Sequence, residues 1–92
     1  MIYLDNLSLY PEAGEGGSYP EQYDVLLNGK TVGYLRIRHG HFTIECPDVG
    51  GTLVYEAYPA GYGEFEDAER SYFLDLALSV VLDYVNGINN DD

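Results

Sequence analysis

The stretch that decides the fold lies at residues 34–45 and reads YLRIRHGHFTIE. Apolar and polar residues alternate on both sides of His39-Gly40, a pattern typical of a β-hairpin with a two-residue turn. This register pairs polar residues across the turn: Arg38 with His41, Arg36 with Thr43, and Tyr34 with Glu45. The other face then carries only apolar side chains, those of Leu35, Ile37, Phe42 and Ile44. We expect the apolar face to form the floor of the core and the polar face to be exposed.

Further strands are predicted on both sides of this hairpin, over residues 2–10, 22–28 and 52–58. Residues 11–20 read PEAGEGGSYP, and their glycine, serine and proline content predicts a loop. Asn28-Gly29 is a strong signal for a second hairpin turn. A strict two-residue turn would place Tyr23, Val25 and Leu27 on the arginine face. We favour a bulged three-residue loop, because it moves these apolar residues to the core face.

A helix is predicted from Glu66 to Asn86. Apolar residues recur there at spacings of three and four, at Phe73, Leu76, Ala77, Val80, Val81 and Tyr84. Gly87 is placed to end the helix, so residues 1–87 are expected to form one domain and 88–92 a frayed acidic tail. The expected fold is therefore α+β, with an antiparallel sheet of four or five strands and one C-terminal helix packed on one face.

Charge sets the expected class of partner. The 92 residues include sixteen Asp and Glu against four Lys and Arg, a formal charge of −12, together with ten tyrosines and no tryptophan. Such a field attracts basic protein surfaces and repels nucleic acid and anionic membranes. One cysteine excludes an internal disulfide, and neither a signal peptide nor a spanning segment is predicted. We expect a soluble protein of the cytoplasm of a host cell.

The first candidate surface combines carboxylates with tyrosines at the junction between the last strand and the helix. Its members are Glu56, Tyr58, Tyr62, Glu64, Glu66, Asp67 and Glu69. Paired carboxylates can perform general acid–base catalysis, but no pocket-forming pattern surrounds these. A row of carboxylates between tyrosines can instead imitate the charge of a nucleic-acid backbone and occupy a basic groove. A solvated acidic helix start is the plainer alternative.

The second candidate surface is cationic and lies on the polar face of the hairpin. Tyr34, Arg36, Arg38 and His41 could hold an anionic metabolite or nucleotide, because two arginines on one strand face can grip a phosphate or carboxylate. The alternative is that these arginines pair with the chain's own carboxylates, with Glu45 across the hairpin as the nearest.

Other motifs give weaker signals for chemistry. His39 and His41 lie near Glu45, Cys46 and Asp48 in sequence, but the turn separates the two imidazoles and Cys46 is expected to face the core, so no metal or cofactor is predicted. The segment Gly14–Ser18 lacks the Lys-Ser/Thr ending of a phosphate-binding loop. No catalytic signature is found, and we expect a protein that is not an enzyme.

Four segments carry a resemblance. They are YPEQYDV at 19–25, GYLRIRHGHF at 33–42, the glycine pair 50–51 before Tyr55-Glu56, and EDAERSY at 66–72. Together they resemble small uncharacterised proteins of bacteriophages and mobile elements, a group that also resembles anti-CRISPR inhibitors in size and acidity. The resemblance implies a binding protein that inhibits a host nucleic-acid-handling or defence protein. A homodimer formed through a sheet edge is also expected as a possibility of this fold.

Overall fold

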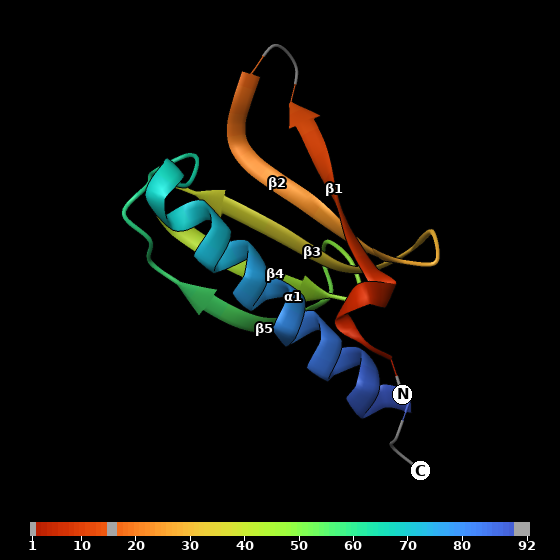
Figure 1. Ribbon diagram of the computed structural model, residues 1–92. Coiled ribbons are helices and arrows are strands. Elements are labelled where there is room, and N and C mark those ends of the chain that lie inside the picture. The colour runs from red at the N-terminus through yellow and green to blue at the C-terminus, as the bar shows by residue number, and fades with distance from the viewer. Residues whose placement is uncertain (1, 15–16, 90–92) are drawn as a thin grey trace.

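The computed structural model of the chain describes residues 2–14 and 17–89, with side chains described for 2–11 and 21–87. Five strands form one antiparallel sheet in which each strand pairs with the next along the chain (Figure 1). They are β1 (Leu7–Gly14), β2 (Gly17–Leu27), β3 (Lys30–Arg38), β4 (His41–Cys46) and β5 (Thr52–Ala57). A short 3-10 turn at Leu4–Asn6 precedes β1, and helix α1 (Asp67–Asn89) follows β5. The expected α+β fold is confirmed.

The central hairpin β3–β4 has the predicted register. Arg38 pairs with His41, and the pairing continues to Tyr34 and Glu45 without a shift. The apolar face is fully buried, with no exposed surface at Leu35, Ile37, Phe42 and Ile44. The alternation in the sequence therefore identifies the core face of the sheet correctly.

Tyr34 was expected to be exposed on the polar face, and this expectation is wrong. Its side chain is only 7% exposed, because β3 is the middle strand and neighbours on both sides cover it. The Tyr34 hydroxyl donates a hydrogen bond to the side-chain carbonyl of Gln22 on β2. Tyr34 is thus part of the packed sheet surface rather than an open contact residue.

The Asn28-Gly29 turn differs from the predicted bulged loop. Both residues have positive φ, 53° and 83°, and they connect Leu27 directly to Lys30 in a two-residue turn. The bulge lies instead within β3 at Val32, because Leu26 pairs with Thr31 while Val25 pairs with Gly33.

The bulge in β3 places the apolar residues of β2 on the core face, as the predicted bulged loop would also have done. It brings Tyr23 and Val25 opposite Leu35 and Gly33, on the core face of the sheet. Val25 is fully buried, and Tyr23 and Leu27 pack against the core. The expected face is confirmed, although the predicted turn type is wrong.

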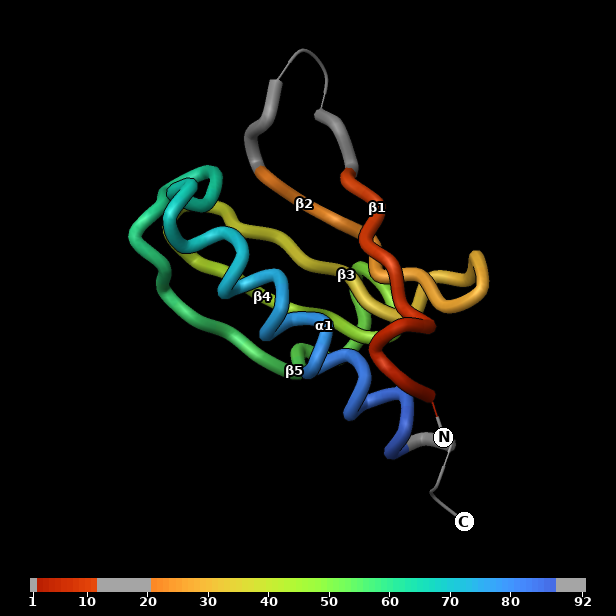
Figure 2. Tube along the Cα trace, in the orientation of Figure 1, coloured from red at the N-terminus to blue at the C-terminus, as the bar shows by residue number. Residues whose placement is uncertain are grey.

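The N-terminal region contains more sheet and less loop than predicted. The strand expected over 2–10 begins only at Leu7, and β1 and β2 continue through most of the segment 11–20 that was expected to be a loop. Pro11 pairs with Tyr23, which is tolerated because β1 is an edge strand with its outer side unpaired. Residues 15–16 of the glycine-rich segment lie outside the described residues. Figure 2 shows β1 and β2 side by side over residues 7–11 and 21–27.

Helix α1 crosses the core face of the sheet (Figure 1). Its buried line contains Ala77, Val81 and Val85, with Phe73 packed at the same face one turn earlier. The helix packs closely on Gly33 of β3, where an added Cβ would lie 2.8 Å from a methyl carbon of Val81. A side chain at this position would push the helix away from the sheet.

The C-terminal end of α1 differs from the prediction. Gly87 was expected to end the helix, but α1 continues to Asn89 and Gly87 is an exposed helical residue. Residues 88 and 89 of the expected tail are therefore helical, and 90–92 lie outside the described residues. Asn86 connects this end to the N-terminus, since its amide accepts from the Ile2 N–H at 2.8 Å and donates to the Ile2 carbonyl at 2.9 Å.

Candidate functional site

Residues 58–66, which we call the connecting segment, link β5 to α1 without helix or strand. The segment contains two of the most exposed large side chains, Tyr58 at 75% and Tyr62 at 69%. Irregular backbone of this length needs partners for its N–H and C=O groups. Contacts from three other parts of the fold provide them.

Glu69 supplies the first set of partners from the first turn of α1. Its carboxylate accepts from the N–H groups of Ala60 at 2.9 Å, Gly61 at 2.8 Å and Glu66 at 2.9 Å. The bond to Glu66 is half of a capping box, in which the third helical residue reaches back to the residue before the helix. Although partial burial acts to raise it, the pKa of Glu69 is lowered by these N–H groups and by the charge of Arg70.

The second set of partners comes from the sheet. The Gly40 N–H donates to the Tyr62 carbonyl at 2.6 Å, and the Glu21 N–H donates to the Gly63 carbonyl at 2.9 Å. Glycine is required at position 61, because a Cβ there would overlap the backbone carbonyl of Glu64, which lies against it. The segment is therefore held against both the β3–β4 turn and strand β2.

Glu21 and Arg70 form the third attachment, beneath the segment. Arg70 donates to both carboxylate oxygens of Glu21, at 2.9 and 3.2 Å, and to the carbonyl of Phe65 at 3.0 Å. Glu21 also accepts from the Phe65 N–H at 2.9 Å and from the Tyr23 hydroxyl. The Glu21 side chain is only 10% exposed, so this is the most enclosed ion pair among the described residues.

Titration of these groups reflects the same network. Burial acts to raise the pKa of Glu21, but hydrogen bonds from Arg70, Tyr23 and Phe65 outweigh it and the pKa is lowered. Burial and the neighbouring Glu21 carboxylate raise the pKa of Tyr23 to about 12. The hydrogen bonds to Glu21 and Asp67 raise the pKa of Arg70, so this side chain is cationic at any working pH.

The rings of the two exposed tyrosines contact the two histidines at the end of the β3–β4 hairpin. The Tyr58 ring stacks on His41, with ring centres 4.9 Å apart and planes 9° apart. The Tyr62 ring meets His39 edge to face at 5.5 Å, and its hydroxyl lies 3.2 Å from Nδ1 of His39. Each tyrosine therefore has one supported side and one open side.

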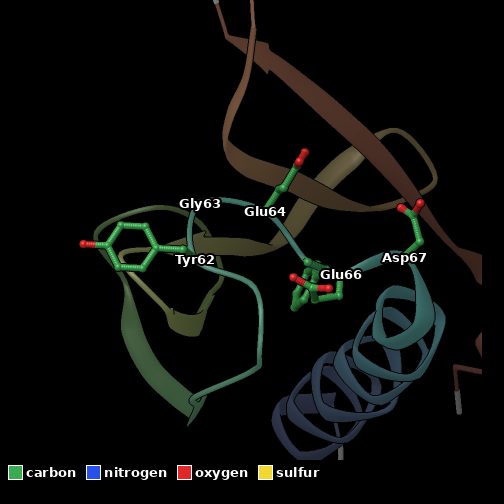
Figure 3. Close-up of a pocket in the computed structure, with 6 residues that line it drawn as sticks. Tyr62, Gly63, Glu64, Glu66 and Asp67 are labelled. Atoms are coloured by element: carbon green, nitrogen blue, oxygen red, sulfur yellow. The ribbon is translucent and has the colours of Figure 1, made fainter.

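The predicted carboxylates divide into several groups. Glu56 contacts His41 at 2.7 Å, Asp67 contacts Arg70 at 2.7 Å, and Glu69 faces the connecting segment. Tyr62, Glu64, Glu66 and Asp67 border a hollow of about 450 Å³, and Figure 3 shows their side chains pointing in different directions. Six of the predicted residues thus lie in or next to the segment: Glu56, Tyr58, Tyr62, Glu64, Glu66 and Asp67. Glu69 differs from them, because its carboxylate binds backbone N–H groups of the chain itself.

The cationic surface forms a second hollow on the open face of the sheet. It has a volume of about 290 Å³ and is lined by Arg36, Arg38, His39, His41 and Thr43. Glu45, the expected partner of the arginines, instead accepts from the Gly50 N–H at 2.9 Å. Among side chains that the structure describes, no carboxylate oxygen lies within 4.0 Å of either guanidinium.

His39 and Thr43 were not among the residues predicted for the cationic surface. The predicted register placed Thr43 opposite Arg36, and that signal was available. The contact between His39 and Tyr62 joins residues 23 positions apart, so no local sequence pattern could predict it.

Within 2–14 and 17–89, no group of three or more His, Cys, Asp or Glu side chains could hold a metal ion. No helix in this part of the chain is both long and apolar enough to cross a membrane. Cys46 is fully buried, as expected, and burial raises the pKa of its thiol to about 11.

Comparison with protein-family models, curated proteins and solved structures finds no match to this chain. The resemblance to phage proteins therefore stays a prediction.

Proposed function

We propose that this protein is a non-enzymatic binding protein that presents the connecting segment to a basic groove on another protein. The carrying observation is that Tyr58 and Tyr62 are exposed by 75% and 69% yet each is held by a histidine. Tyrosine is a common anchor of protein interfaces, since it buries a large area for few rotatable bonds. Anchors that are already ordered before binding lose less entropy on association.

Charge supports the choice of a basic partner. Glu64 and Glu66 belong to the segment, Asp67 follows it directly, and the chain as a whole carries a formal charge of −12. Such a surface accelerates encounter with a cationic groove and disfavours acidic partners. A protein that handles nucleic acid offers a groove of this kind. The proposed role is therefore inhibition of a host nucleic-acid-handling or defence protein, in the manner of a phage inhibitor that takes the place of the nucleic acid.

The first test is capture from a host lysate with tagged protein, at about 50 mM and about 500 mM salt, a range across which surface charge becomes screened. The proposal predicts capture of a nucleic-acid-binding protein at low salt, with loss of that protein at high salt and on addition of DNA. Tyr58→Ala combined with Tyr62→Ala should abolish the capture. Retention of the same protein by this variant would contradict the segment as the contact.

A matched pair of charge variants separates the segment from the overall charge. Glu64→Lys with Glu66→Lys changes the net charge by the same amount as Asp75→Lys with Asp83→Lys, which alters exposed positions along α1. The proposal predicts that only the first pair prevents capture. Equal loss in both pairs would show that binding depends on total charge and not on this surface. Glu69 is left unchanged, because its carboxylate holds the backbone.

A further inference from the structure

The hollow on the open face of the sheet adjoins the tyrosine surface, because its lining residues His39 and His41 contact Tyr62 and Tyr58. Arg36 and Arg38 stand two residues apart on β3, so their side chains leave the same face about 7 Å apart. Thr43 lies directly opposite Arg36, and His41 lies opposite Arg38. Side chains from two strands therefore converge on one volume of about 290 Å³.

The groups that line this hollow are rich in donors. Each guanidinium offers about five N–H donors and no acceptor, and the Thr43 hydroxyl can also donate. Two carboxylates of the neighbouring strands have other partners: Glu45 accepts from the Gly50 N–H, and Glu56 contacts Nε2 of His41. Among the described side chains, three of the four Lys and Arg residues have no carboxylate partner, namely Lys30, Arg36 and Arg38, and the two arginines lie together in this hollow.

Such a set of donors selects a ligand that only accepts. We propose that the hollow binds a small phosphate-bearing anion, with Arg36 and Arg38 gripping the phosphate oxygens and Thr43 donating a further hydrogen bond. The planar fork of arginine matches two oxygens of a phosphate or carboxylate, and two forks match the larger number of oxygens on phosphate. The volume lies at the lower end for small-molecule sites, which favours a phosphate monoester over a dinucleotide.

The negative charge of the whole protein opposes this ligand, but its range is limited. At physiological ionic strength the Debye length is about 8 Å, so acids on the far side of the molecule are largely screened. The two guanidinium groups are in direct contact with the ligand and are screened least. Local charge therefore decides the sign of the interaction in the hollow.

The test is a titration followed by amide chemical shifts of the folded protein, with sodium chloride at matched ionic strength as the reference. The probes are inorganic phosphate, ribose 5-phosphate and succinate. The proposal predicts saturable shifts at residues 36–43 with both phosphate probes and weaker binding of succinate. Shifts that do not saturate, or that sodium chloride reproduces, would overturn it. Equal affinity for succinate would overturn the assignment to phosphate.

Variants locate the site and separate it from the proposed function. Arg38→Gln, at an exposed position, should weaken phosphate binding about tenfold or more, as expected for loss of a charge-assisted hydrogen-bond pair. Lys30→Gln removes the same charge from the start of β3, outside the hollow, and should leave the affinity unchanged. An equal loss in both variants would overturn the site. Glu64→Lys with Glu66→Lys should still bind phosphate, so the two proposals can fail separately.

Discussion

Two sets of carboxylates meet at the start of α1 and serve opposite purposes. Glu21 and Glu69 turn inward, where they accept hydrogen bonds from backbone N–H groups, and Glu21 also from Arg70. Glu66 and Asp67 turn outward, and the Asp67 side chain is 98% exposed. The comparison teaches that a formal charge of −12 is not a uniform surface property. Some of the acids in this chain hold the fold together, and only the rest can meet a partner.

The largest effect is expected when the inward set loses its cation. Arg70→Leu would remove the bidentate partner of Glu21, whose side chain is only 10% exposed in the wild type. Breaking a buried pair of this kind costs about 3 kcal/mol, at the low end because Arg70 is itself partly exposed. Urea denaturation of the variant and the wild type measures the difference in the free energy of unfolding. A decrease in the free energy of unfolding below about 1 kcal/mol would show that the Glu21–Arg70 pair contributes no more than an exposed ion pair.

A smaller loss is expected at Glu69. Glu69→Ala removes the acceptor of three backbone N–H groups, including one of the helix cap, and should cost about 2 kcal/mol. Amide hydrogen exchange should accelerate most at Gly61 and Glu66, whose N–H groups lose their acceptor. Unchanged exchange at both amides would show that the connecting segment is held by its other contacts alone.

Acidification should remove the stability that the inward set contributes. The pKa values of Glu21 and Glu69 are lowered in the folded protein, so the unfolded chain binds more protons than the folded one in the window below their ordinary value of 4.5. Their contribution to stability is therefore complete above that value and is lost as the pH falls through the folded pKa values. Denaturation midpoints measured from neutral to acidic pH should fall less steeply for Glu69→Gln than for the wild type. Parallel curves would contradict this assignment.

The smallest effect on stability is expected in the outward set. Glu66→Gln removes an exposed charge at the helix start and should change the free energy of unfolding by less than about 1 kcal/mol, the usual contribution of charge near a helix end. It should nevertheless weaken capture of a basic partner. Thermal melting and the lysate capture described above measure the two effects on the same preparation. A large loss of stability would remove the distinction between the two sets.

Local sequence patterns predicted the part of the fold in which neighbours in sequence are also neighbours in space. The β3–β4 register followed from alternation around a two-residue turn, and the buried side of α1 followed from its spacing of apolar residues. The helix end was mispredicted at Gly87, because glycine favours a stop but does not impose one. The loop predicted over 11–20 was also mispredicted in large part, because pairing with β2 extends the edge strand despite Pro11.

The sequence indicated two candidate surfaces, but the structure changes which residues can take part in them: Tyr34 is buried, and Glu69 binds backbone N–H groups. Composition singled out both the carboxylate–tyrosine group and the arginines, and the structure brings the groups together where Tyr58 stacks on His41. Glu69 could not be separated from Glu66 by sequence, because both are acids at a helix start. Their difference arises only when the connecting segment folds back and offers its N–H groups to one of them.

The sequence by itself determined the acidity of this protein, its α+β class and the two faces of its central hairpin, because composition and short-range periodicity act within a few residues. Tertiary structure alone decided which carboxylates are internal, which arginines lack a carboxylate partner among the described side chains, and which tyrosines are both exposed and held. The contacts behind these outcomes include Glu21–Arg70, 49 residues apart, and His39–Tyr62, 23 residues apart. Such contacts depend on the packing of the whole chain, and no local propensity encodes them.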